Sequence, residues 1–343
     1  MRVANLAQSL LTRTQTLQTQ ARLQIAEQQI STGYKSNVFS GLGGDSKKLL
    51  DFDRARSGLE TFMATIQAAE RRATIMDASM TSVTDIAQQV RADNFSTRAF
   101  MGDASVRQNV MTGAEEAINT TISALNAQFE GRYLFSGYEF DTKPIDMTAD
   151  DMIAAVEAQL TADGFPPGTP VTAADIEAAI DTYLGINPAG AAGYYASGSS
   201  DTVTARIDEN QEMDYGLTAD NAAFRETFKG FLMTSMSVDR YDELNQTSAT
   251  EFDDSFTDAR VFVEQGFDQT NQLVGQLGIR RQKLEDTRIG HEKTIDILVQ
   301  GMSDIQDADV YEAITEFQRL QVQLQASYQV TAQLSNLSLV NFI

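Results

Sequence analysis

The sequence ends in "DADVYEAITEFQRLQVQLQASYQVTAQLSNLSLVNFI", residues 307–343, which contains none of the residues that usually break a helix. Glycine and proline are both absent from Met302 to Ile343, and again from Arg2 to Thr32. Because these two residue types interrupt or weaken helices, both ends of the chain are predicted to be long helices. At about 1.5 Å per residue, uninterrupted helices would be roughly 60 and 45 Å long.

Apolar residues at both ends recur at spacings of three, four and seven, which is typical of helices that pack on one another. Near the N-terminus they are Val3, Leu6, Leu10 and Leu17. Near the C-terminus they are Val310, Ile314, Phe317, Leu324 and Tyr328, with a second apolar line of Val322, Ala326, Val330, Leu337 and Val340. Seven glutamines lie in residues 1–30 and seven in residues 306–343, so these helices can pack without burying charge.

Wide apolar faces on two terminal helices are not expected to be satisfied within one molecule. We expect the ends to fray in an isolated chain and to be buried between copies of the chain in an assembly. The predicted subunit-interface residues are Leu6, Leu10, Leu17, Phe317, Leu324, Tyr328, Leu334 and Leu337. On this hypothesis, aspartate at position 324 blocks assembly while the middle of the chain stays folded.

Between the ends, residues 46–130 are predicted to form helices broken near Gly102 and Gly113, and residues 255–300 return as a second helical segment. All five prolines lie between Pro144 and Pro188. "TADDMIAAVEAQLTADG" and "TAADIEAAIDTYLG" predict two short capped helices, and "DTVTARIDENQEMDYGL" predicts a β-hairpin.

The predicted fold class is therefore mainly α: a long antiparallel helical rod or coiled coil built from both chain ends, with a small β-hairpin and an inserted mixed α/β outer domain. Three regions follow from this prediction. Residues 1–45 and 301–343 are terminal helical arms, residues 46–140 and 200–300 are a helical rod with the β-hairpin, and residues 141–199 are the inserted outer domain.

The net charge of −22 is concentrated in the middle of the chain. Residues 1–140 hold 14 basic and 14 acidic side chains, residues 141–275 hold 6 and 25, and residues 276–343 hold 6 and 9. A chain this acidic is repelled by phosphate groups, so nucleic acid and anionic membranes are excluded as expected partners. No run of 18 apolar residues and no secretory leader is recognised, so any export is expected to proceed without a cleaved signal peptide.

Catalytic and metal-binding motifs are not found. Cysteine is absent, and the one histidine, His291, is interpreted as a surface residue of a charged helix. The glycine-rich segment at residues 31–50 lacks a phosphate-binding pattern, because Asp45 and Ser46 separate Gly44 from Lys47. We therefore predict no catalytic, cofactor-binding or metal-binding residue and no cofactor.

Acidic pairs and one aromatic segment could in principle bind ligands, but for both we prefer a structural interpretation. The acidic pairs Asp51 with Asp53, Asp253 with Asp254 and Asp307 with Asp309 do not fit a calcium loop and are interpreted as solvated helix faces, the last pair as a helix start. The aromatic segment "FEGRYLFSGYEF", residues 129–140, is interpreted as a packed corner next to the inserted domain, with a ring-stacking ligand site as the alternative. Nothing selects a pair of carboxylates for glycoside hydrolysis.

Five stretches resemble the bacterial flagellin family of axial proteins, and within it the hook-filament junction group. They are "AEQQISTGYKSN", "GLGGDSKKLL", "GRYLFSGYEFDTKPI", "LGIRRQKLE" and the C-terminal segment quoted first. The resemblance implies a secreted structural subunit of the flagellum that packs against copies of itself, against a hook-side junction protein and against flagellin. It also implies an export chaperone on the C-terminal helix, and a joint between inner and second layers at residues 33–46 in which glycines relieve backbone strain.

Other functions remain open from the sequence. The nearest is filament flagellin itself, which would polymerise alone from seeds. A type III tip protein would bind membranes or target cells, and a cytosolic coiled-coil adaptor would have terminal helices that are ordered in a soluble dimer.

Overall fold

The computed structural model describes residues 2–36, 42–100, 102–186, 196–242 and 249–340. The chain forms two compact units, one from Met1–Thr61 with His291–Ile343 and one from Phe62–Gly290. Two long helices, α2 (Asp45–Thr97) and α7 (Ala249–Gln306), contribute to both units. The prediction of a mainly α fold with long helices and a small β-hairpin is confirmed, and a second small hairpin is present as well. The division into three regions stays a prediction.

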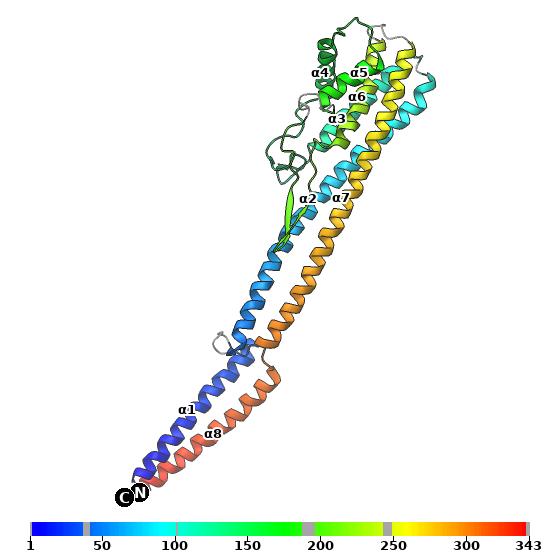
Figure 1. Ribbon diagram of the computed structural model, residues 1–343. Coiled ribbons are helices and arrows are strands. Elements are labelled where there is room, and N and C mark those ends of the chain that lie inside the picture. The colour runs from blue at the N-terminus through cyan, green and yellow to red at the C-terminus, as the bar shows by residue number, and fades with distance from the viewer. Residues whose placement is uncertain (1, 37–41, 101, 187–195, 243–248, 341–343) are drawn as a thin grey trace. The chain divides into compact units, whose positions relative to one another are not determined.

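In the first unit, α1 (Arg2–Thr32) and α8 (Val310–Val340) lie side by side (Figure 1). The predicted pairing of the two chain ends is thus confirmed. His291, which begins the C-terminal part of this unit, is only 8% exposed, so the interpretation as a surface residue is wrong. Its neighbours in sequence are charged, but its own side chain is buried.

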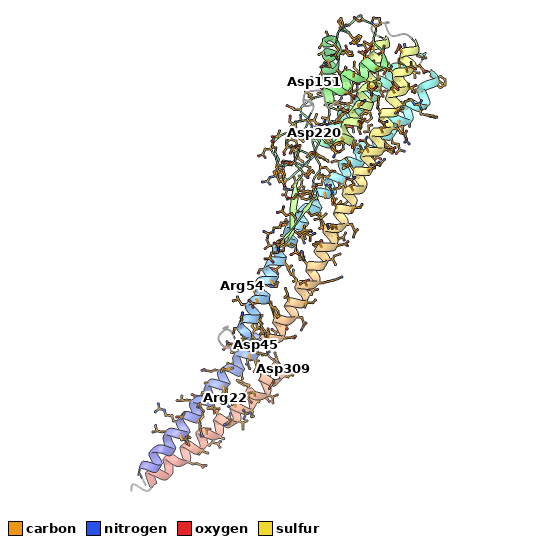
Figure 2. All side chains as sticks on the ribbon, in the orientation of Figure 1. Arg22, Asp45, Arg54, Asp151, Asp220 and Asp309 are labelled. Atoms are coloured by element: carbon orange, nitrogen blue, oxygen red, sulfur yellow. The ribbon has the colours of Figure 1, made fainter. Side chains whose placement is uncertain are left out.

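The C-terminal segment that lacks glycine and proline is nevertheless interrupted, because α7 ends at Gln306 and α8 begins at Val310. The carboxylate of Asp309 accepts hydrogen bonds from the backbone N–H of Tyr311 at 2.9 Å and of Glu312 at 3.1 Å. Asp309 therefore caps the N-terminus of α8 (Figure 2). This confirms the interpretation of Asp307 and Asp309 as the start of a helix. Short polar side chains that bond to nearby backbone have broken the helix here.

In the second unit, α2 and α7 run antiparallel and are joined by ion pairs. Arg91 lies 3.1 Å from Glu264, and Arg281 lies 2.6 Å from Asp77. Farther along, Arg288 lies 3.5 Å from Glu70. The residue number falls in one helix as it rises in the other, which confirms the predicted antiparallel packing of segments from opposite ends of the sequence.

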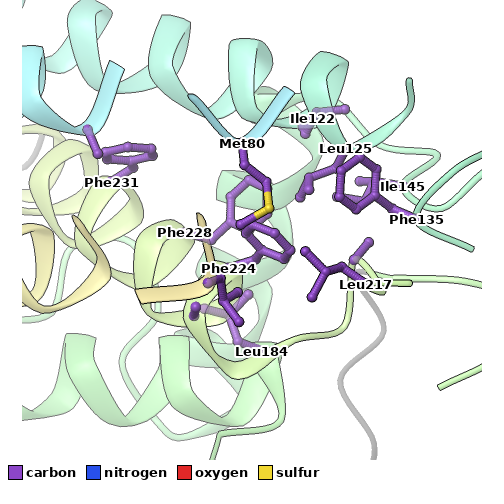
Figure 3. Packing of buried hydrophobic residues seen from close by; sticks show 14 of the residues in the cluster. Met80, Ile122, Leu125, Phe135, Ile145, Leu184, Leu217, Phe224, Phe228 and Phe231 are labelled. Atoms are coloured by element: carbon purple, nitrogen blue, oxygen red, sulfur yellow. The ribbon is translucent and has the colours of Figure 1, made fainter. Parts of the chain in front are cut away.

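The core of this unit lies among α3 (Ala104–Leu125), α4 (Ala149–Ala162), α5 (Ala173–Leu184), α6 (Ala222–Asp242) and parts of α2 and α7. Figure 3 shows Met80 of α2, Leu125 of α3 and Phe224, Phe228 and Phe231 of α6 among its buried side chains. Both predicted capped helices, α4 and α5, are present and begin in a capping box.

One predicted helix break is absent. Gly113 lies inside α3, and no atom lies within 4 Å of the place where its Cβ would be. A single glycine weakens a helix by about 1 kcal/mol relative to alanine, which tertiary packing easily offsets. The break near Gly102 is confirmed, because α2 is followed by the short helix η2 (Arg98–Phe100) and α3 begins at Ala104.

Two antiparallel hairpins complete the unit. In the first, β1 (Gln128–Phe129) pairs with β2 (Arg132–Tyr133), and this hairpin was not predicted. In the second, β3 (Thr204–Asp208) pairs with β4 (Gln211–Asp214), which confirms the predicted hairpin. After β2, the buried ring of Phe135 meets Phe224 edge-on at 6.1 Å. Gly137 has φ 63°, and a Cβ there would lie 2.5 Å from backbone oxygens of Ser199 and Asp201. This agrees with the packed corner predicted for residues 129–140.

Buried cations of α6 bind carboxylates of α4 and α5. Lys229 Nζ lies 2.8 Å from Glu177 and 2.7 Å from Asp181, and 4.0 Å from the ring centre of Phe262. Arg240 Nε donates to Glu157 at 2.8 Å. Because a buried charge is tolerated only with a close partner, these pairs fix how the two short helices lie on α6.

We predict that the close approach of α6 to α7 at two glycines is essential for stability. A Cβ on Gly230 would lie 2.6 Å from the backbone nitrogen of Val263, and one on Gly266 would lie 2.6 Å from the Cα of Thr227. Gly230→Ala and Gly266→Ala should each lower the free energy of unfolding by about 1–3 kcal/mol, because the helices are forced apart.

Denaturant unfolding measures this effect, and two other helical glycines supply the control. At Gly113 and Gly275 an added Cβ would have no atom within 4 Å, so alanine there should raise stability by up to about 1 kcal/mol. Equal effects at all four positions would contradict the proposed close approach.

A second prediction concerns Glu226, which stands beside the Lys229 cluster. Burial raises the pKa of the Glu226 carboxyl, Glu177 and Asp181 add to the rise, and Lys229 only partly offsets it. A carboxyl whose pKa is raised by folding destabilises the fold above its unfolded-state pKa, and the penalty disappears as the pH falls below that value. Glu226→Gln should therefore raise the melting temperature near neutral pH, and the gain should shrink on mild acidification. The exposed Glu212 supplies the control, because Glu212→Gln should leave the melting temperature unchanged at both pH values.

Candidate assembly surface

The seam between α1 and α8 is built from small and large side chains in about equal number. On α1, the residues that face α8 are at least half-buried and recur at spacings of four and three: Thr12, Thr16, Thr19, Leu23, Ala26 and Ile30. The matching residues of α8 are Ala313, Phe317, Leu320, Leu324 and Ser327. This is the spacing of a coiled-coil seam.

Much of the seam is nevertheless polar or short. The hydroxyls of Thr16 and Thr19 donate to backbone oxygens four residues back in α1, each at 2.9 Å. They are therefore satisfied within their own helix and form no hydrogen bond to α8. Across the two helices, Gln20 Nε2 donates to the Tyr328 hydroxyl at 2.7 Å.

Several of the larger apolar side chains of α1 face away from α8. Leu10 and Leu17 each precede a seam threonine by two residues, and two residues turn an α-helix by about 200°. They therefore lie on the side opposite the seam, where Leu17 is 57% exposed. Leu11 and Ile25 widen this exposed face, and both are also more than half exposed.

On α8 the same division is found. Val322 lies two residues from both Leu320 and Leu324 of the seam, so it too points away from α1, and it is 65% exposed. Val330 is exposed as well. We name Leu10, Leu11, Leu17 and Ile25 of α1 the outward face of α1, and Val322 and Val330 the outward face of α8.

The predicted interface residues fall into three groups. Leu10 and Leu17 lie on the outward face of α1, whereas Phe317 and Leu324 lie in the seam and Tyr328 at its edge. The side chains of Leu6, Leu334 and Leu337 lie outside the described residues. Whether these residues contact other subunits stays a prediction, but Leu324→Asp would disturb the seam within one chain as well.

Sequence reasoning missed part of the outward faces. Leu11 and Ile25 lie beside the line of apolar residues that ends in Leu10 and Leu17. A search for one regular spacing finds only one such line, so it does not detect a face that is two lines wide. Val322 and Val330 belong to the second apolar line of α8, so the signal was present in the sequence. Of that second line, the predicted interface residues include only Leu337.

Charges on α1 and α8 are few, and one ion pair of α8 is local. Arg319 donates to both oxygens of Glu316, at 2.7 and 2.6 Å, and this hydrogen bonding lowers the pKa of the Glu316 carboxyl. Both groups are solvent-exposed, so the pair contributes little to stability. The outward faces are therefore apolar surfaces flanked mainly by neutral glutamine and threonine.

The joint that connects these arms to α2 and α7 is tightly hydrogen-bonded. Lys35 Nζ donates to the carbonyl oxygens of Asp304 at 2.8 Å and Ile305 at 3.1 Å, at the end of α7. The backbone N–H of Lys35 donates to Gln306 at 2.8 Å, and that of Ala308 donates to Gly33 at 2.7 Å. The cation at a helix C-terminus and the backbone pairing fasten the two breaks in the chain to each other.

The glycines of the joint support the structural interpretation of residues 33–46. Gly33 has φ 76° and Gly43 has φ 59°, a region that favours glycine. Residues 37–41 lie outside the described part of the chain. Asp45 begins α2 at the end of this segment (Figure 2).

Neither a metal site nor a membrane-spanning helix is found in the described residues. No group of three or more histidine, cysteine or acidic side chains there is arranged to hold a metal ion. Within the same ranges no helix combines the length and apolarity needed to cross a bilayer.

Two family models match the sequence. The bacterial flagellin N-terminal helical region matches residues 3–139, and the bacterial flagellin C-terminal helical region matches residues 261–343. These ranges include all of α2 and α8 and most of α1 and α7. Comparison with curated protein sequences gave no significant match.

Three of the solved structures with a similar fold come from different bacteria. A protein from Vibrio parahaemolyticus described as a flagellar hook-associated protein is 15% identical, with 76% of this chain and 97% of that chain covered and a TM-score of 0.56. FlgL of Bacillus cereus is 10% identical, with 74% and 99% covered and a TM-score of 0.51. Flagellar hook-associated protein-3 of Legionella pneumophila is 12% identical, with 74% and 98% covered and a TM-score of 0.51.

At these identities the structural likeness shows a shared fold, whereas the family models match the sequence itself at both of its ends. The helices that they match are those that form the seam and the joint. The chain therefore belongs to the bacterial flagellin family.

Proposed function

We propose that this protein is a structural subunit of the bacterial flagellum that joins the hook to the filament, and that it performs no catalysis. The observation that carries the proposal is the pair of outward faces, which leave leucine, isoleucine and valine side chains in solvent although α1 and α8 are paired. Exposed apolar side chains gathered on one side of a helix are typical of interaction sites. The names of the structurally similar hook-associated proteins favour the junction over the filament.

In this proposal the partners are copies of the chain, a hook-side junction protein and flagellin. The outward faces of neighbouring copies pack on one another, which removes their leucine and valine side chains from water. Before assembly the protein is secreted without a cleaved signal peptide, and an export chaperone covers the C-terminal helix. Filament flagellin is the second candidate, since the family models match both kinds of protein.

A deletion strain complemented with variants tests the proposal. Loss of the gene should leave hooks on the cells and release flagellin into the medium, whereas loss of a filament subunit would remove only that component. Leu17→Asp or Val322→Asp should fail to restore filaments and reduce the number of swimming cells at least about tenfold, because an unpaired carboxylate cannot be buried in an apolar contact.

Exposed glutamines close to these positions supply matched controls. Gln15→Asp and Gln321→Asp add the same charge within two residues of Leu17 and Val322 but outside the outward faces, and both should restore swimming. Secreted variant protein in the medium shows that export is intact. Filaments of normal number with both leucine and valine variants would overturn the proposed assembly surface.

A separate prediction concerns the joint, which has to be stiff if it transmits torque. Lys35→Met keeps the length of the side chain but removes both hydrogen bonds to the end of α7. Hydrogen exchange of the backbone amides at positions 35 and 308 should accelerate about tenfold or more in this variant. The reason is that each charge-assisted hydrogen bond contributes about 1.5–3 kcal/mol to the stability of the joint. Lys35→Arg retains a cationic donor and should exchange like the wild type. Unchanged exchange in Lys35→Met would show that the backbone pairing suffices.

A further inference from the structure

An arginine and aromatic cluster lies in the second unit, beside the first hairpin. Arg72 of α2 and Arg132 of β2 both lie over the ring of Phe140, with their guanidinium carbons 5.5 and 5.6 Å from the ring centre. Arg72 also donates to the Tyr215 hydroxyl at 3.2 Å. Tyr138 stands edge-on to Phe140 at 6.4 Å and is about half exposed.

In the described part of the chain, neither guanidinium has a carboxylate within ion-pair distance. Elsewhere in this acidic chain, arginines such as Arg240 and Arg281 hold carboxylates directly. Glu139 and Asp141 line the same open surface as Arg132, but neither forms an ion pair with it. Arg132 is exposed and Arg72 is half-buried, so the cluster faces solvent.

A guanidinium that lies over an aromatic ring is held in place by a cation–π contact, while those of its N–H donors that make no other hydrogen bond remain available. Such donors bind carboxylates in a planar, bidentate manner. Because part of the side-chain entropy is already lost, an arginine held in this way is a better binding site for an acid than a mobile surface arginine.

We propose that this cluster binds exposed carboxylates from the acidic segment 141–275 of a second copy of the chain. That segment carries 25 acidic and 6 basic side chains, so its charge is complementary to the two arginines. The contact joins different surfaces of the two copies, and contacts of that type generate rings or helical arrays. The inference rests on the proposed function, since it requires copies that lie next to one another.

Site-specific photo-cross-linking in assembled flagella tests the inference. p-Benzoylphenylalanine replaces Tyr138 at the rim of the cluster in one strain and Leu17 on the outward face of α1 in another. The Tyr138 probe should give cross-links between copies that map to residues 141–275. Arg132→Glu should reduce the yield at least about fivefold and raised salt should reduce it as well, because the contact is ionic.

Arg71→Glu is the matched control, since it places the same charge on an exposed arginine next to Arg72 and should leave the yield unchanged. Copy-to-copy cross-links from Leu17 without any from Tyr138 would overturn this inference alone. Tyr138 cross-links that map to another protein or to residues outside 141–275, or that are insensitive to Arg132→Glu, would also overturn it. Absence of copy-to-copy cross-links from both probes would reject the proposed assembly itself.

Discussion

The pairing of α1 with α8 depends on a narrow seam that buries only part of the apolar side chains of the two helices. Threonine, alanine and serine occupy about half of its positions, and leucine, isoleucine and phenylalanine occupy the rest. The hydrophobic stabilisation of a contact scales with the apolar area that it removes from water, so the small positions contribute little. Leu10, Leu17 and Val322 stay exposed. Their burial would require a further partner surface.

In the second unit, by contrast, the large apolar side chains are buried within one chain. The rings of Phe224, Phe228 and Phe231 are fully buried within the unit, and Lys229 and Arg240 are neutralised by carboxylates of α4 and α5. Buried apolar area and paired charges stabilise this unit within one chain. On the proposed assembly, folding and contacts between copies depend on different helices, and a substitution in one set should leave the other largely intact.

The sequence predicts most of the fold because its signals are local. Missing helix breakers predict α1 and α8, and threonine followed by aspartate predicts the caps of α4 and α5. The errors arise where tertiary context decides. Gly113 remains helical because α3 packs on α6, His291 is buried despite its charged neighbours, and the break at residues 307–309 involves the distant Gly33. The side of α1 that faces α8 is likewise invisible in one sequence, because threonine at heptad spacing does not look like a seam.

Apolar outward faces alone leave the register between copies ambiguous. Leu10 and Leu17 are seven residues apart, so sliding one helix by two turns, about 10 Å, replaces one leucine by an equivalent one. Hydrophobic attraction is non-directional and distinguishes such registers poorly. A directional contact elsewhere on the chain removes the ambiguity, because a guanidinium and a carboxylate pair only within a narrow range of distance and angle. The cation–π contacts of Arg72 and Arg132 with Phe140 restrict the orientation of both guanidinium groups, which suits the proposed contact to this role.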